Sequence, residues 1–186
     1  MKASLNSYYI FMYLSDIIKK VISMKKKIVF LSAICFAIDQ LSKALLDHFL
    51  ELNQSIDIVP SFFSITYVRN EGAAWSLFSG NQVFLIIMSF IALYVIYVYF
   101  IKNKSLSTLE LWSYGLLLGG IFGNLIDRVL RGFVTDFLDF TIFNYHFPVF
   151  NIADIGIVIG VFFTIVSLWK GEKNGNNRSN RECQEN

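Results

Sequence analysis

The sequence is poor in charged residues, prolines and cysteines. Of its 186 residues only 16% are charged, two are Pro and two are Cys, whereas charged residues make up about 25% of a typical soluble domain. With Cys35 in an apolar run and Cys183 in a polar tail, a disulfide framework is not expected. The few prolines exclude collagen, and the low charge excludes disorder over most of the chain. The net charge of +2 predicts no nucleic-acid partner.

Apolar residues are present in excess. Hydrophobic residues make up 55% of the chain and aromatic residues 17%, and the mean hydropathy is +0.53. A membrane-spanning helix needs about 20 mostly apolar residues. Four runs approach or meet that length, at about residues 28–46, 83–101, 109–126 and 150–169. The composition therefore predicts a four-span, all-α membrane protein.

Basic residues flank these runs on one side of the membrane. They precede the first run, separate the second from the third and follow the fourth: Lys25, Lys26, Lys27, Lys102, Lys104, Lys170, Lys173, Arg178 and Arg181. Positively charged flanks remain in the cytoplasm. We therefore predict that both termini are cytoplasmic, and that residues 47–82 and 127–149 lie outside.

The remaining segments differ from the spans. Residues 52–68 are β-branched and aromatic, which predicts one or two strands at the outer membrane surface. Residues 171–186 are polar and are expected to form a disordered cytoplasmic tail. Residues 1–23 contain an apolar stretch too short to span, so they are interpreted as a start-site artefact or an interfacial helix. The functional unit is expected at 24–170.

Polar residues inside the spans gather at one depth. Intramembrane ionisable residues are costly and by default indicate function. Near the predicted outer surface lie Asp39, Lys43, Asn124, Asp127, Arg128, Asn151 and Asp154, together with Arg69 and Asn70 from the outer loop. Their helical spacings of three or four residues put the members of each set on one face, so each set can point into the bundle.

Simpler explanations remain open for each set. Asp39 and Lys43 also fit an ordinary ion pair, and Asp127 with Arg128 fit interfacial charges. Asn151 with Asp154 fits a helix capping box in which Asp replaces Glu. Asp136 lies among apolar residues after Gly132, and a solvated loop aspartate explains it equally well.

Four blocks in order make the chain resemble the lipoprotein signal peptidases, also called signal peptidase II. The blocks are DQLSK at 39–43, RNEGAAWSLF at 69–78, GGIFGNLIDRVLRGFVTDFLDF at 119–140 and FPVFNIADIGIVIG at 147–160. The resemblance covers about residues 28–169. Residues 1–23 depart from the family pattern, and Thr135 stands where an aliphatic residue is common.

The resemblance implies an aspartic intramembrane protease of the bacterial cytoplasmic membrane. Such an enzyme removes the signal peptide of a diacylglyceryl-modified prolipoprotein, cutting just before the lipidated Cys. The implied fold is four transmembrane helices with a small extracytoplasmic β-cradle, and the active site is near the outer face. The implied catalytic pair is Asp136 and Asp154. Supporting positions fall on Asp39, Lys43, Asn70, Gly72, Asn124, Asp127, Arg128, Asn151 and Ala153.

Residue types support this chemistry. Two neighbouring acids in a low-dielectric site share one proton, so one can activate a water and the other can protonate the leaving amine. We predict no cofactor, no metal, since His48 and His146 form no HExxH motif, and a monomer in contact with membrane lipid. Ser42 and Lys43 are adjacent, which weakens a Ser–Lys protease.

Two alternatives belong to other classes of protein. A small proton- or cation-coupled transporter needs polar residues along the whole membrane depth. The middle of the second span is apolar apart from Ser89 and tyrosines, so the one-sided cluster favours surface chemistry. A non-catalytic membrane scaffold requires no such concentration of acids at one depth.

Overall fold

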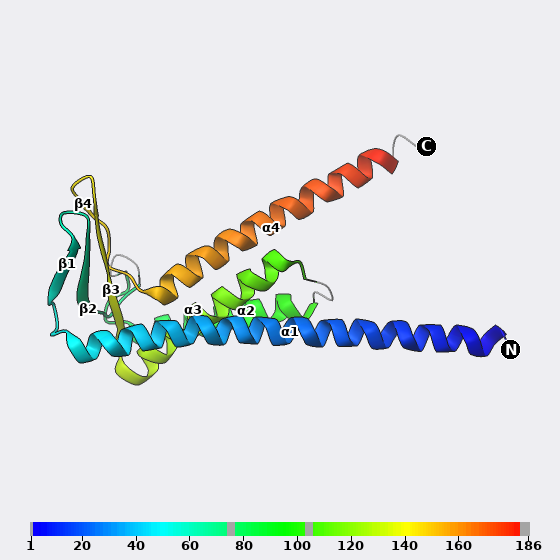
Figure 1. Cartoon of the computed structure of the whole chain (residues 1–186), viewed down its shortest axis with the longest axis horizontal. Helices are drawn as coiled ribbons and strands as arrows, with labels where there is room; N and C mark the ends of the chain where they lie inside the picture. The colour runs from blue at the N-terminus through cyan, green and yellow to red at the C-terminus, as the bar shows by residue number, and fades with distance from the viewer. Residues whose placement is uncertain (1, 74–76, 103–105, 183–186) are drawn as a thin grey trace.

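The computed structural model describes residues 2–73, 77–102 and 106–182, and the side chains of residues 22–73, 77–99 and 106–171. The helices are α1 (Lys2–Phe49), α2 (Gln82–Lys102), α3 (Thr108–Arg131) and α4 (Ile152–Glu182). The strands are β1 (Ser55–Val59), β2 (Phe63–Asn70), β3 (Val134–Ile142) and β4 (Tyr145–His146). The sheet lies across one end of the helices, and both chain termini lie at the other (Figure 1).

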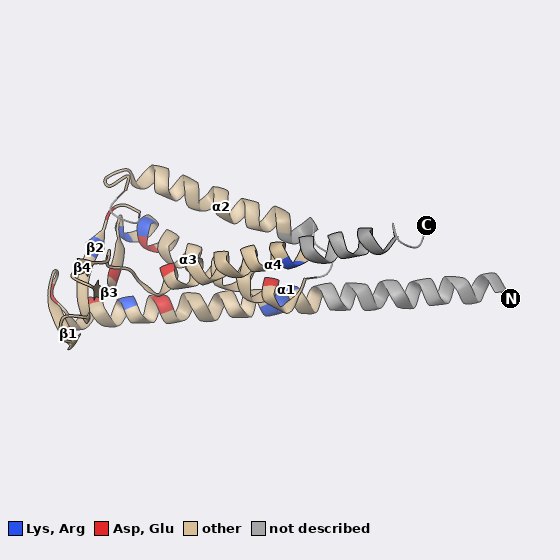
Figure 2. Ribbon diagram, turned by 90° about the horizontal axis from the view of Figure 1, so that it is seen from above, with Lys and Arg blue, Asp and Glu red and all other residues tan. Residues whose placement is uncertain are grey.

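All four helices contain a segment long and apolar enough to cross a membrane. These segments cover residues 22–49, 82–99, 108–131 and 152–171. The predicted four-span fold with a small sheet is therefore confirmed. Charged residues of the described helices gather next to the sheet and at the opposite end, and the ribbon between them is uncharged (Figure 2).

The described residues nearest each end of the chain lie in helices. Helix α1 begins at Lys2, so residues 2–23 of the expected extension are continuous with the first span. Helix α4 continues to Glu182, which differs from the disorder expected from residue 171. Residues 172–182 contain no proline that would end a helix.

Helix α3 packs between α1 and α4. Its glycines allow this close approach: a Cβ at Gly119 would lie 2.7 Å from Cys35 Cβ. Ser107 and Glu110 form a capping box at its start, and Gly132 ends it in the left-handed conformation with φ of 77°. The helix thus runs to Arg131, beyond the predicted end at 126, and keeps Asp127 and Arg128 helical.

The sheet is antiparallel with strand order β1-β2-β3-β4. Strands β1 and β2 confirm the prediction for residues 52–68. Strand β3 excludes the solvated loop that was the alternative explanation for Asp136, because residues 134–140 pair with β2. Side chains alternate between the two faces of a strand. Asp136 therefore shares a face with Leu138 and Phe140, and Thr135 lies on the other.

Candidate active site

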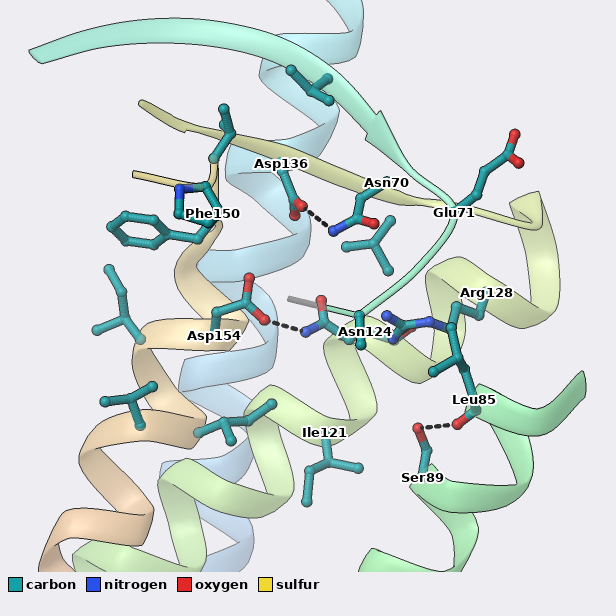
Figure 3. A pocket seen from close by; sticks show the side chains of 18 of the residues that line it. Asn70, Glu71, Leu85, Ser89, Ile121, Asn124, Arg128, Asp136, Phe150 and Asp154 are labelled. Carbon is teal, nitrogen blue, oxygen red and sulfur yellow. Dashed lines mark hydrogen bonds between the residues drawn. The ribbon is translucent and has the colours of Figure 1, made fainter. Parts of the chain in front are cut away.

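A cleft of about 940 Å³ is lined by residues of α2, α3, α4, β2 and β3. Asp136 comes from β3 and Asp154 from the first turn of α4, and both side chains point into the same space (Figure 3). The neighbouring wall is apolar and includes Leu85, Ile121 and Ile157. The cleft thus combines two carboxylates with an apolar surface inside the membrane-spanning bundle.

Asp136 is buried and is held by two side-chain amides. Its exposed fraction is 2%. Its Oδ1 accepts a hydrogen bond from Asn151 Nδ2 at 2.6 Å, and its Oδ2 accepts one from Asn70 Nδ2 at 2.7 Å. Burial, and then the charge of Asp154, raise the pKa of Asp136 to about 7, although the two amides act in the opposite direction. The group can therefore hold or release a proton near neutral pH.

Asp154 is fixed at the start of α4. Its Oδ1 accepts a hydrogen bond from Asn124 Nδ2 at 2.8 Å, and its Oδ2 accepts one from the backbone N–H of Asn151 at 3.1 Å. Asn151 Oδ1 in turn accepts the backbone N–H of Asp154 at 2.9 Å. The predicted capping box is therefore present. Asn151 both caps helix α4 and holds Asp136, because its Nδ2 donates a hydrogen bond to Asp136.

A buried ion-pair network lies beside the two carboxylates. Lys43 Nζ is 2.8 Å from Asp39 Oδ2 and 2.8 Å from Asp127 Oδ2, and it donates to Asn124 Oδ1 at 3.1 Å. Asp39 Oδ1 accepts the backbone N–H of Ala153 at 2.9 Å. The network thus ties α1 to α3 and α4, and the predicted shared face of Asp39 and Lys43 is confirmed.

Arg128 holds the chain that follows β2. Its Nη2 donates to the backbone oxygen of Gly72 at 2.9 Å and its Nη1 to that of Asn124 at 3.2 Å. Asn70 Oδ1 accepts the backbone N–H of Gly72 at 2.8 Å. Arg128 therefore positions the segment that carries Asn70. Arg69 also lines the cleft, and its guanidinium carbon lies 4.6 Å from the centre of the Phe133 ring.

Some contacts of this region were not predicted from the sequence. Gln40 Nε2 donates to Asp39 Oδ2 at 3.1 Å and to the Gly123 oxygen at 3.3 Å. The position of Gln40 inside the DQLSK block is the feature of the sequence that could have indicated its part in the site. Asp47 contacts Thr135 and Arg131, and no local pattern indicated this.

Taken together, the geometry suits proton transfer. Side-chain amides and one backbone N–H hold the two carboxylates on one cleft, and neighbouring acids in such surroundings can share a proton. Among the described residues, no group of three or more His, Cys, Asp or Glu side chains is placed to hold a metal ion.

Comparison with known proteins gives a consistent result. The family described as "Signal peptidase (SPase) II" matches residues 31–170. The lipoprotein signal peptidase of Staphylococcus aureus (strain MRSA252) is 40% identical over 136 residues, which cover 73% of this chain and 83% of the relative.

Solved structures agree with this relationship. One, described as a bacterial membrane enzyme structure by the in meso method at 2.3 Å resolution, has a TM-score of 0.74 and 37% identity, over 79% of this chain and 90% of that chain. A second, at 1.9 Å resolution, has a TM-score of 0.69 and 38% identity, over 76% and 91%. The resemblance seen in the sequence is confirmed, and the chain belongs to the signal peptidase II family.

Proposed function

We propose that this protein is an aspartic-type signal peptidase that removes the signal peptide from bacterial prolipoproteins. The observation that carries the proposal is the placement of Asp136 and Asp154 on one cleft, each held by amide donors. Family membership and the relative named lipoprotein signal peptidase support the same reaction. The transporter alternative has no support from these relatives.

In this mechanism the pair holds one proton before the reaction. The ionised carboxylate takes a proton from a water, whose oxygen attacks the scissile carbonyl carbon. The protonated carboxyl gives its proton to the nitrogen of the leaving amine as the C–N bond breaks. One proton enters and one leaves, so the pair ends with the single proton it began with. The mechanism is the same whichever of the two aspartates carries the proton at the start.

Asn70, Asn124 and Asn151 position the pair. Their N–H groups occupy oxygens of both carboxylates at 2.6 to 2.8 Å. The side-chain oxygen of each asparagine also accepts a hydrogen bond. The donors are the Gly72 N–H for Asn70, Lys43 Nζ for Asn124 and the Asp154 N–H for Asn151. The amides therefore cannot turn without losing a second bond, which keeps the carboxylates preorganised.

The substrate fits the two surfaces of the cleft. A prolipoprotein with a diacylglyceryl-modified Cys presents a peptide bond next to two acyl chains. The acyl chains would lie along the apolar wall near Leu85, Ile121 and Ile157, so that the bond before the Cys reaches the aspartates. A single chain supplies all these residues, which supports a monomer in contact with membrane lipid.

The active site is proposed to face the outer side of a bacterial cytoplasmic membrane, with both termini in the cytoplasm. Basic residues at the end away from the sheet support this orientation. In a Cys183→Ser background, Asp57→Cys should react with a membrane-impermeant thiol reagent in intact cells. Thr108→Cys should react only after permeabilisation. The reverse pattern contradicts the orientation.

The direct test uses purified protein in lipid or detergent. A prolipoprotein carrying the diacylglyceryl group, and the same protein without it, are incubated with the enzyme, and mass spectrometry follows release of the signal peptide. We expect cleavage of the lipidated form just before the modified Cys. Absence of cleavage by folded protein, or equal cleavage of the unlipidated form, would contradict the proposed substrate.

A further inference from the structure

Only two residues, Gly132 and Phe133, connect the end of α3 to the start of β3. This short turn matters because its two sides carry different parts of the site. Helix α3 carries Asn124, which bonds Asp154, and strand β3 carries Asp136. The separation of the two aspartates therefore depends on how the turn is held. Within the turn, Gly132 adopts a positive φ and its N–H donates to the Arg128 oxygen at 3.1 Å, so the contacts of the flanking residues add to what holds the turn.

One carboxylate, that of Asp47, bonds to residues on both sides of this turn. Asp47, in the last turn of α1, forms an ion pair through Oδ2 with Arg131, the last residue of α3. Its Oδ1 accepts a hydrogen bond from Thr135 Oγ1, the second residue of β3, at 3.2 Å. The bridge therefore joins three elements at the residue next to Asp136.

Burial distinguishes this bridge from an ordinary surface ion pair. Asp47 and Arg131 are 27% and 33% exposed, and such pairs alone contribute little. Thr135, however, is 0% exposed. A buried hydroxyl without a partner is unfavourable, so Thr135 in this position requires an acceptor. An aliphatic residue in this position would need none. Asp47 is therefore the acceptor that the buried Thr135 hydroxyl requires.

We propose that Asp47 and Thr135 are positioning residues, and that the Asp47 carboxylate fixes Asp136 relative to α3 by bridging Arg131 and Thr135. This inference rests on the proposed function. Thr135 points away from the cleft, because side chains on a strand alternate. The bridge thus acts on the backbone that carries Asp136, and it predicts an effect on turnover rather than on substrate binding.

The test compares variants by kcat and KM on lipidated prolipoprotein, per molecule of folded enzyme. Thr135→Val keeps the shape and removes the hydroxyl. We expect kcat to fall roughly 3- to 30-fold with KM little changed, less than the ~100-fold cost of a misplacement of about 1 Å. Thr135→Ser restores the hydroxyl and should recover most of the turnover. Asp47→Ala should lower kcat at least as much as Thr135→Val.

A matched control exists in the same sheet. Thr66 Oγ1 donates to Asp139 Oδ2 at 2.8 Å, so Thr66→Val also removes a threonine–aspartate bond, but three residues away from Asp136 on β3. Its kcat should remain that of the unmodified enzyme. A merely structural role for Thr135 would lower thermal stability in Thr135→Val and leave kcat per folded molecule unchanged.

The double variant Asp47→Ala with Thr135→Val decides between one bridge and two separate effects. If the bridge acts as a unit, the double variant should be no slower than Asp47→Ala alone. Multiplied losses, equal kcat for Thr135→Val and Thr135→Ser, or a similar loss in Thr66→Val would overturn the inference. An unmodified enzyme without cleavage would contradict the proposed function instead, so the two failures are distinguishable.

Discussion

Two pairs of aspartates lie at the sheet end of the bundle in opposite surroundings. Asp39 and Asp127 share the ammonium of Lys43, which is 2.8 Å from each and as buried as they are. Asp136 and Asp154 receive N–H groups of asparagines. Among the described side chains, no lysine or arginine forms an ion pair with either of them. Asp39 and Asp127 thus form a compensated pair, which has an ion-pair partner. Asp136 and Asp154 form an uncompensated pair, which has none among the described side chains.

This difference in surroundings suits the two pairs of aspartates to different roles, one structural and one chemical. An ammonium between two carboxylates compensates their buried charge, and the network around Lys43 ties three helices together. Neutral amides orient a carboxylate without neutralising it, so burial and the second acid raise the pKa of Asp136 to about 7. The uncompensated pair is therefore the one suited to acid–base catalysis at neutral pH.

The largest effect is expected from removing an ionisable group of the uncompensated pair. Asp136→Asn and Asp154→Asn should each lower the rate of cleavage by ~10²–10⁴-fold or more, because general acid–base assistance is worth about that much. Folded yield should be kept, since asparagine removes a buried charge. Cleavage rate per folded enzyme is the measurement. Asp139→Asn, on the other face of β3, is the control and should retain turnover. Near-normal turnover of Asp136→Asn would make Asp127 the candidate partner of Asp154.

Lys43→Met should act on stability instead. The substitution leaves two buried carboxylates without their counter-charge, and breaking a buried pair costs about 3–5 kcal/mol. Thermal unfolding in detergent should show a clear loss of stability. Adding Asp127→Asn returns the net charge of the three residues to its original value and should recover part of the loss. Equal stability of Lys43→Met and the unmodified protein would contradict the structural role of this network.

A smaller effect is expected from Asn70→Ala, in the pH dependence. A hydrogen bond to a carboxylate favours its charged form, so losing the Asn70 bond should raise the pKa of Asp136 further. Cleavage by the unmodified enzyme should decline above about pH 7 as the pair loses its proton. In Asn70→Ala that decline should move to higher pH. Asn81→Ala, with an exposed side chain, should leave it in place. A shift toward lower pH would contradict the assignment.

The smallest effect is expected from shortening the chain. Residues 1–23 match none of the four family blocks, and Met24 with Lys25, Lys26 and Lys27 supplies a start and an orientation signal. A chain beginning at Met24 should insert and cleave as the full chain does. Membrane levels and cleavage are the two measurements. Normal membrane levels with reduced cleavage would show that the extension takes part in activity.

Local spacing predicted the compensated pair better than the uncompensated one. Asp39 and Lys43 are four residues apart on one helix, so their contact follows from helix geometry alone. The Asn151 and Asp154 capping box is equally local. For Asp136 a solvated loop remained an open alternative, because β3 depends on pairing with β2, whose Val68 lies 68 residues earlier. Only the family resemblance pointed to Asp136, and pairing across the sheet explains its burial.

Contacts between distant elements could not be predicted. The bond from Asn70 to Asp136 joins residues 66 apart, and that from Thr135 to Asp47 joins residues 88 apart. Nothing in either local sequence specifies its partner. The hydroxyl of Thr135 was visible as a departure from the family pattern, but its buried position next to α1 was not.

The most direct test of the account asks whether Asp136 and Asp154 act as one unit. Cleavage of lipidated prolipoprotein is measured for Asp136→Asn, for Asp154→Asn and for the double variant, each per molecule of folded enzyme. Groups that serve one water fail together, so the account predicts that the double variant is about as slow as the slower single variant. Losses that multiply in the double variant would show two independent contributions and contradict a shared proton.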